Sequence, residues 1–542
     1  MRVLCLALGA LLVVSAVHAA SGHKWRIVKD HWSEADEEGF GQFVQSIGDS
    51  NCSSSESCMR SAANPYRESD PRGFDVDADC AKFVYFLRAY YAWKNGLPFS
   101  LVSGVSGTGE DLRFSRTGNH AVSRHDLIDH GGGIDGPSAM RAVLGSVTSA
   151  TYRQAANADK GVLPDFYSPK IGPGTIRPGT VLYDVNGHAA IVYRVDKDGR
   201  IHYMGASPDF SIARDVYGAQ FGQPPVELGG GFKNWRPLTL AGAHADGAGD
   251  LIGGHISLAR NVEIPNYSLE QYLGTEASAS HMLKNVRFSY QGVGLGYYEF
   301  VRVAVSGGEM STNPIYEFKL TLQEMCKEFR DRAASVEQAT ENGISSKPHP
   351  PSLPENIYAA ADTTWESYAT PKRDARIKAI FAQSYKDIAE MLELWRKRDP
   401  RIVYDGLDLK ADLQSVYDEE TKTCPVTYLN SAKQPVTLTF DIMVHRLYAM
   451  SFDPYDCVEH RWGATGDEAA TCTDGGDKQR WYRAEQSYRD RIDPDATARM
   501  GFSLAQLERH NQPLRVANVD LKSLVDNMGP RVAFTGMQPL DR

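Results

Sequence analysis

The segment that most constrains the fold is CAKFVYFLRAYYAWK at 80–94, which is mostly apolar and contains no Gly or Pro. Its charged residues, Lys82, Arg88 and Lys94, are six positions apart, so on a helix at about 100° per residue they point in three different directions. A helix without a polar face is a buried helix. The sequence therefore predicts a buried helix that begins at or just after Cys80.

Two residues at the start of this helix could be functional. Asp79 is an N-cap candidate, because its carboxylate can accept from the free N–H groups of the first turn. Cys80 then lies at the positive end of the helix dipole, where the pKa of a thiol is lowered and a thiolate nucleophile becomes available. The aspartates within 75–79 oppose this effect by raising the thiol pKa. The alternative is a buried structural cysteine without reactivity.

The chain begins like an exported protein. Arg2, the apolar run 3–14 and the small residues at 19–20 form the pattern of a signal peptide over residues 1–20. No other segment approaches the ~20 consecutive apolar residues of a membrane span. We therefore expect a secreted protein, periplasmic or extracellular, without an integral membrane segment. The formal net charge of −10 argues against nucleic acid or an anionic membrane surface as a partner.

The cysteine count points to one free thiol. Eight cysteines minus Cys5 of the signal leave seven, and an odd number in an oxidising compartment leaves one thiol free or paired with another chain. Proximity in sequence suggests the pairs Cys52–Cys58 and Cys457–Cys472, with Cys326–Cys424 as the third. Cys80 is then the unpaired residue.

Composition divides the mature chain into three regions. We expect a first domain over 21–240, a β-rich region with a helix over 255–345, and a mainly helical domain over 355–542. The Gly- and Ala-rich segment 241–254 marks the first boundary, and the proline-rich segment 347–354 marks the second. The role of the chain after residue 240 stays open.

Local patterns assign elements within these regions. Segments 320–339 and 373–397 have helical periodicity without Pro, whereas 286–290 and 297–305 resemble strands. In the first domain, 189–195 and 200–204 are short runs rich in Val, Ile and Tyr. They are joined at Asp196-Lys-Asp-Gly199, a turn signal that predicts a hairpin. A last edge strand is expected within 229–237.

His188 starts the first strand of this hairpin. An imidazole at the mouth of a strand can project over a cleft while its backbone is anchored. Together with a free Cys80 at a helix start, it suggests a thiolate–imidazolium pair, in which the sulfur attacks a carbonyl carbon and the imidazolium protonates the leaving amine. A structural or merely exposed histidine is the alternative.

The same residues carry a family resemblance over about residues 64–238. DCAKFV at 79–84 resembles the Asp-Cys-Ser-Gly-Phe-Val signature of the NlpC cell-wall cysteine peptidases, and RPGTVLY at 177–183 is similar to their Pro-Gly-Asp strand. GHAAIVYRVDKDGRI at 187–201 is similar to the Gly-His-Val-Ala-Ile-Val hairpin of the related CHAP amidases. The resemblance implies an α+β, papain-like domain in which the Cys-bearing helix packs on a small antiparallel sheet. It also implies Cys80 as nucleophile and His188 as base, with no metal or organic cofactor.

Further site residues follow from the resemblance. The residue that orients the imidazole is expected at Asp209, with Ser207 and His202 as alternatives. Tyr66 is similar to an upstream tyrosine that lines the cleft near the nucleophile. Asp79 is expected to contribute to substrate binding beside it.

A set of histidines, His120, His125 and His130, recurs every five residues. Neither helix nor strand geometry puts all three on one face. Zinc ligation would need a folded loop, so the pattern favours a solvated loop at the cleft edge over a metal site.

The sequence thus predicts a secreted cysteine amidase or endopeptidase that cleaves amide bonds of peptidoglycan peptides. One alternative is a catalytically weak or inactive papain-like domain that serves as an envelope binding module. Another is a transglutaminase-like variant that transfers the acyl group to an amine. The scissile bond and the oligomeric state are not predicted.

Overall fold

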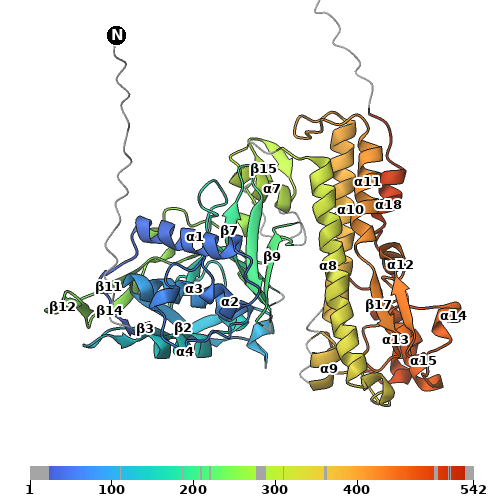
Figure 1. The fold of residues 1–542 in the computed structure, drawn as a ribbon, viewed down its shortest axis with the longest axis horizontal. Coiled ribbons are helices and arrows are strands. Elements are labelled where there is room, and N and C mark those ends of the chain that lie inside the picture. The colour runs from blue at the N-terminus through green and yellow to red at the C-terminus, as the bar shows by residue number, and fades with distance from the viewer. Residues whose placement is uncertain are drawn as a thin grey trace, which may run out of the picture.

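The structure is a computed structural model that describes residues 23–531, except 110, 186, 208–209, 219–220, 276–287, 309–310, 359–362, 493–497, 511 and 513. The predicted signal peptide lies outside the described residues. Both helices and strands occur, consistent with the α+β class predicted. The six-stranded sheet lies before residue 240, and the longest helices lie after residue 310 (Figure 1).

A six-stranded sheet organises the N-terminal part. Its order is β5 (Phe166–Tyr167), β10 (Gly231–Trp235), β6 (Val181–Asp184), β7 (His188–Val195), β8 (Ile201–Ala206) and β9 (Ile212–Val216), and every neighbouring pair is antiparallel. The predicted β7–β8 hairpin is therefore confirmed. The strand predicted within 229–237 is present as β10. It is not the edge strand that was expected, because the two-residue strand β5 pairs with it on the side away from β6.

Helix α3 (Cys80–Asn95) packs on one face of this sheet beside α1 (Glu34–Asp49). It begins at Cys80, as predicted, and the Asp79 carboxylate accepts from the Lys82 N–H at 3.1 Å. The helix ends at Gly96, whose φ of 64° is left-handed, as helix C-caps commonly are. The helix is buried from Phe83 to Trp93, which confirms the prediction.

Both faces of the sheet are buried, and β7 separates two apolar cores. Ala189, Ile191 and Tyr193 belong to the core that contains α3. Ala190 and Val192 belong to a second core on the opposite face. Because successive side chains of a strand point to opposite faces, this division assigns a face to residues 188–193 of β7, before the irregularity that precedes Arg194.

Helix α7 (Tyr297–Val305) covers the second core with Phe300, Val301 and Ala304. The sequence predicts a strand at 297–305, and this prediction is wrong. The β-branched and aromatic residues of this segment instead form one apolar face of a helix, and that face is buried in the second core. The turn between β7 and β8 lies directly against α7. Gly199 in this turn has a φ of 79°, and a Cβ there would collide with the Arg302 carbonyl oxygen, so this close approach requires glycine.

The remaining N-terminal elements surround the sheet. They are β1 (Lys24–Trp25), α2 (Ser55–Arg60), β2 (Phe99–Ser106), β3 (His120–Leu127), β4 (Ile134–Asp135), α4 (Gly136–Ser146), α5 (Ser149–Tyr152), β11 (Leu238–Ala241), β12 (His244–Ala245), β13 (Leu251–Ile252), β14 (His255–Leu258), α6 (Glu270–Leu273), β15 (Phe288–Tyr290) and β16 (Val293–Leu295), with 3-10 turns at Arg67–Ser69, Leu112–Phe114 and Asn261–Glu263. The strand expected at 286–290 is thus present as β15.

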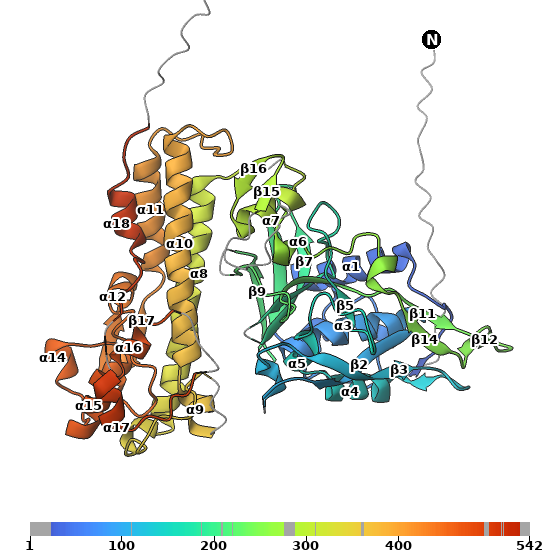
Figure 2. The same ribbon diagram turned by 180° about the vertical axis from the view of Figure 1, so that it is seen from behind.

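The C-terminal part contains two long antiparallel helices, α8 (Pro314–Glu341) and α10 (Pro371–Arg396), on the side that faces the N-terminal part (Figures 1 and 2). Both were predicted from periodicity. Behind them lie α9 (Thr363–Tyr368), α11 (Leu409–Lys422), β17 (Val426–Leu429), β18 (Pro435–Leu438), α12 (Phe440–His445), α13 (Val458–Arg461), α14 (Gly466–Ala469), α15 (Gly476–Ala484), α16 (Gln486–Arg489), α17 (Leu504–His510) and α18 (Leu521–Asp526), with a 3-10 turn η4 at Ile344–Ser346.

The disulfides follow the predicted pairing. Cys52–Cys58, Cys326–Cys424 and Cys457–Cys472 are bonded, and Cys80 is free. Disulfides of this kind are typical of an oxidising compartment. Among the helices of the described residues, none combines the length and apolar character needed to cross a bilayer.

Candidate functional site

The Cys80 sulfur lies against the backbone at the start of β7. Its Sγ is 4.0 Å from the carbonyl oxygen of Gly187, and the N–H of Ala189 points toward it. Next to it, the Tyr152 hydroxyl donates to the Ala81 carbonyl at 2.6 Å. The thiol is partly buried in a niche of backbone and aromatic groups.

This niche disfavours the thiolate. Burial raises the pKa of the Cys80 thiol above its ordinary value, and the negative charge of Asp79 adds to the rise. The N–H groups of Ala189 and of the helix start oppose this rise without cancelling it. The lowered pKa expected from the helix dipole is therefore overturned, and the sulfur stays a neutral thiol at pH 7.

His188 lies on the other face of β7. Its neighbours Gly187 and Ala189 touch Cys80, whereas His188 shares the face of Ala190, which belongs to the second core. A Cβ added to Gly205 on β8 would lie 3.0 Å from the His188 Nε2 and 3.5 Å from the Ala190 Cβ. The ring therefore packs over Gly205, and the sheet separates it from the sulfur.

The surroundings of His188 come from the helical part of the chain. Burial, together with the positive charges of Arg376 on α10 and Lys327 on α8, lowers the pKa of His188 to about 4. Asp184, its cross-strand partner on β6, acts in the opposite direction. The ring is neutral at pH 7 and faces α8 and α10 rather than α3.

Of the predicted orienting residues, the two that the structure describes, Ser207 and His202, have other partners than His188. Asp209 lies outside the described residues. Ser207 is in the turn after β8, where its N–H donates to the Ser211 carbonyl at 2.8 Å. The His202 ring is 2.7 Å from an Asp196 oxygen and packs beside Tyr193, on the α3 face.

Tyr66 is placed far from the nucleophile. Its hydroxyl accepts from the Asn95 side chain at 2.9 Å, and Asn95 is the last residue of α3. At 1.5 Å per residue, this end of the 16-residue helix is about 22 Å from Cys80. The expected cleft contact is therefore wrong. Asp79 stays beside Cys80 as the helix cap, ion-paired with Lys82 at 3.2 Å.

The three spaced histidines are exposed. His120 and His125 are in strand β3 rather than in the loop that was expected, and His130 follows it. Among the described residues, the groups with metal-ligand geometry do not include these histidines.

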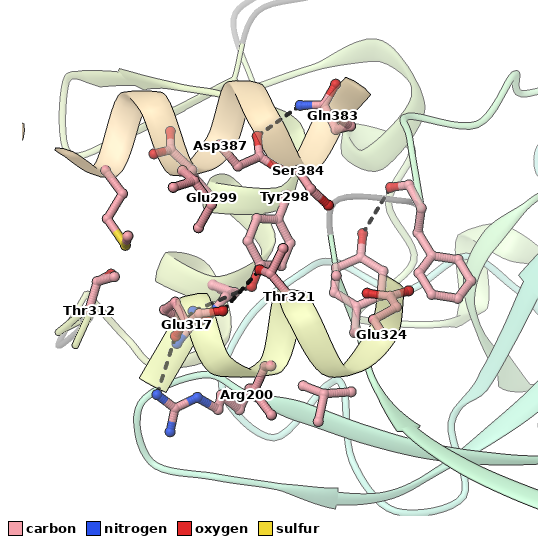
Figure 3. Close-up of a pocket in the computed structure, with 18 of the residues that line it drawn as sticks. Arg200, Tyr298, Glu299, Thr312, Glu317, Thr321, Glu324, Gln383, Ser384 and Asp387 are labelled. Atoms are coloured by element: carbon pink, nitrogen blue, oxygen red, sulfur yellow. Dashed lines mark hydrogen bonds and ion pairs between the residues drawn. The ribbon is translucent and has the colours of Figure 1, made fainter. Parts of the chain in front are cut away.

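A cavity of about 580 Å³ opens on the His188 face of the sheet, between the β9 edge and helices α7, α8 and α10 (Figure 3). Sites for small ligands usually have volumes in this range. Its lining includes Arg200, Arg214, Asp215, Tyr217, Phe221, Tyr297, Tyr298, Glu299, Arg302, Thr312, Glu317, Thr321, Glu324, Lys327, Gln383, Ser384, Asp387, Glu390 and Arg401. These residues come from five separate segments, so no local sequence motif indicates the site.

One wall of the cavity carries two arginines. Glu317 on α8 accepts from Arg302 at 2.9 Å and from Arg200 at 3.2 Å (Figure 3). Asp198 is a second carboxylate in this cluster, 2.8 Å from Arg200 and 3.8 Å from Arg302, so the two guanidinium charges are balanced by two carboxylates. The Nε atoms of both arginines are buried without a hydrogen-bond partner.

The other wall carries carboxyl groups. Burial raises the pKa of Asp387 to about 6, and the charges of Glu390 and Glu299 also raise it. Burial, followed by the charges of Asp215 and Glu328, raises the pKa of Glu324 to about 8. A cavity lined by arginine, carboxyl and aromatic side chains can bind a ligand that has groups of both charges and an apolar part.

No known protein family, no curated protein sequence and no solved structure matches this chain.

Proposed function

We propose that this chain is a binding protein. Its N-terminal domain is a papain-like domain of the NlpC/CHAP type without a working Cys–His pair, and its ligand occupies the cavity between β9, α7, α8 and α10. The resemblance at 79–84 and 187–201 and the packing of α3 on an antiparallel sheet support the papain-like assignment. The observation that carries the binding role is that Cys80 and His188 lie on opposite faces of β7.

The hydrolase and acyl-transfer alternatives need the imidazole within hydrogen-bond reach of the sulfur. In this sheet, the ring could reach the α3 face only if β7 slipped by one residue. That slip would move Ala189 and Ile191 out of the core that contains α3 and would put Ala190 and Val192 in their place. Each pair is packed in its own core, so the slip would disrupt both. Burial of these side chains in both cores therefore stabilises the present register of β7, in which the His188 ring and the Cys80 sulfur lie on opposite sides of the sheet.

The cavity walls favour a peptide with free amino and carboxylate groups as the ligand. The Nε–H groups of Arg200 and Arg302, which lack a partner, can donate to a carboxylate. The carboxyl groups of Glu299 and Glu390 fit an amine, and the tyrosines cover an apolar side chain. Stem peptides of peptidoglycan have this chemistry. Such a ligand also agrees with the exported compartment that the disulfides favour.

The test is calorimetric titration of the purified protein with soluble stem peptides. Ser384 points into the cavity from α10 (Figure 3), and Ser384→Trp should fill it and weaken binding at least tenfold. Ala334→Trp on the exposed side of α8 is the matched control and should bind normally, as should Cys80→Ala. Melting temperatures confirm that each variant is folded.

A parallel assay follows release of new amino groups from purified sacculi. The proposal expects none from the wild type or from Cys80→Ala. Release by the wild type that Cys80→Ala abolishes would instead establish a cysteine hydrolase. Normal peptide binding by Ser384→Trp would place the ligand elsewhere.

A further inference from the structure

A second cluster of ionisable groups lies inside the helical part, away from the cavity. His349 follows η4, Asp453 lies between α12 and α13, and Glu485 lies between α15 and α16. The side chains of His349 and Asp453 are 3% and 0% exposed, and Glu485 is 0% exposed. One nitrogen or oxygen atom from each of the three lies within 4.8 Å of the others.

The His349 ring is oriented as a metal-binding imidazole usually is. It stacks on Trp481 with ring centroids 4.0 Å apart, and its Nδ1 lies 2.6 Å from the Pro350 carbonyl oxygen. A carbonyl can only accept, so Nδ1 carries the proton and Nε2 is free to present a lone pair. Nε2 lies 2.7 Å from the Asp453 Oδ2, a contact that needs either a proton or a cation.

Glu485 strengthens the case for a cation. Neither of its carboxylate oxygens has a donor group as partner, although the residue is fully buried, and its close side-chain contact is with the Asp453 carboxyl. The Oδ1 of the neighbouring Asp456 also lacks a donor, while its Oδ2 accepts from the Ser451 hydroxyl at 2.6 Å. Leaving buried carboxylates without donors or a counter-charge costs several kcal/mol.

The nearby arginines direct their hydrogen bonds elsewhere. Arg461 donates to the carbonyl of Ser451 and to the Thr370 hydroxyl. Arg489 donates to the carbonyl of Tyr482 and to the Gln486 side chain. The guanidinium groups thus balance charge at a distance but do not fill the coordination positions of Glu485.

We propose that His349, Asp453 and Glu485 bind one divalent transition-metal ion, with Asp456 as the nearest additional oxygen donor. Ligand atoms at about 2.0–2.2 Å from a common ion lie no more than about 4.4 Å apart, so the three side chains, whose ligand atoms lie within 4.8 Å of one another, would move closer together on binding. An imidazole nitrogen with carboxylate oxygens suits Zn²⁺ or Mn²⁺ better than Mg²⁺ or Ca²⁺, which prefer oxygen ligands alone. The site is closed to solvent, so the ion would tie three distant segments together in a structural role.

The first test is metal analysis of the full-length protein after incubation with Zn²⁺ or Mn²⁺ and gel filtration. The account expects about one ion per chain in the wild type and in Glu324→Gln, which alters a raised-pKa carboxyl outside the cluster. Glu485→Gln should bind at least tenfold less metal and melt at a lower temperature. A wild type without stoichiometric metal would overturn the proposal.

A proton shared between Glu485 and Asp453 is the competing explanation. In that case Glu485 is already neutral, and Glu485→Gln should leave the melting temperature nearly unchanged, which would contradict the metal site. If Glu485→Gln does not fold, metal binding is tested instead on wild-type protein from which a chelator has removed metal ions. Zn²⁺ and Mn²⁺ should raise its melting temperature, Mg²⁺ and Ca²⁺ should not, and Co²⁺ should give visible absorption bands. Absence of both responses would refute the site.

Discussion

The two faces of the six-stranded sheet differ in chemistry although they share the same strands. The α3 face is a continuous apolar core in which Phe83, Tyr85 and Tyr90 are fully buried. The opposite face has an apolar centre, but its rim toward α8 and α10 carries ionisable groups and the 580 Å³ cavity. Cys80 lies at the edge of the first face and His188 at the edge of the second. A sheet can therefore have both members of a familiar pair beside the same strand, one on helix α3 and one on β7, and still keep them apart.

The largest effect should come from the apolar face. Tyr85 packs against Trp235 with ring centroids 5.0 Å apart, and its hydroxyl donates to Asp165 at 2.6 Å. Tyr85→Ala should lower the free energy of unfolding by about 3–5 kcal/mol, because it leaves a cavity in a close-packed core. Tyr85→Phe removes only the hydrogen bond and should cost about 1–2 kcal/mol. Denaturant titration measures both, and equal losses would show that packing does not dominate this face.

A smaller effect tests the position of the His188 ring. Gly205→Ala adds a methyl group 3.0 Å from the His188 Nε2 and 3.3 Å from the Ala189 carbonyl oxygen. We expect a loss of about 1–3 kcal/mol from this overpacking. Gly145 on α4 has open space around it, so Gly145→Ala should be neutral or slightly stabilising. If both variants were equally stable, the ring would not lie over Gly205.

The charged rim should show itself in the pH dependence of stability. The folded-state pKa of Glu324 is about 8, above its ordinary value of 4.5, so the folded state binds the extra proton between these values. The stability from this group is complete below pH 4.5 and is lost as the pH rises through 8. Glu324→Gln removes that dependence. Its melting temperature relative to the wild type should therefore rise from pH 5 to pH 8.5, and a constant difference would contradict the raised pKa.

Much of the fold could be predicted from local sequence. The apolar run at 80–94, the Asp79 cap and the odd cysteine count led to α3 and to a free Cys80, and periodicity located α8 and α10. These features depend on neighbours within one or two helical turns. The 297–305 segment was mistaken for a strand because short apolar runs fit helix and strand alike.

The separation of Cys80 from His188 could not be predicted in this way. A strand with one buried face shows alternation, but Ala189–Tyr193 is apolar at every position because both faces of β7 are buried. The sequence then carries no signal for the face on which His188 lies. The cavity and the His349 cluster were missed because their residues are brought together only by tertiary packing.

The most direct test is the pH profile of Cys80 alkylation by iodoacetamide in the wild type and in His188→Gln, with Cys80→Ala as the labelling control. If the sheet separates sulfur from imidazole, labelling should be slow at pH 7 and should rise with a thiol pKa above the ordinary ~8.5. His188→Gln should then give the same profile. Fast labelling at pH 6–7 that His188→Gln abolishes would contradict the account, because it would require a thiolate–imidazolium pair.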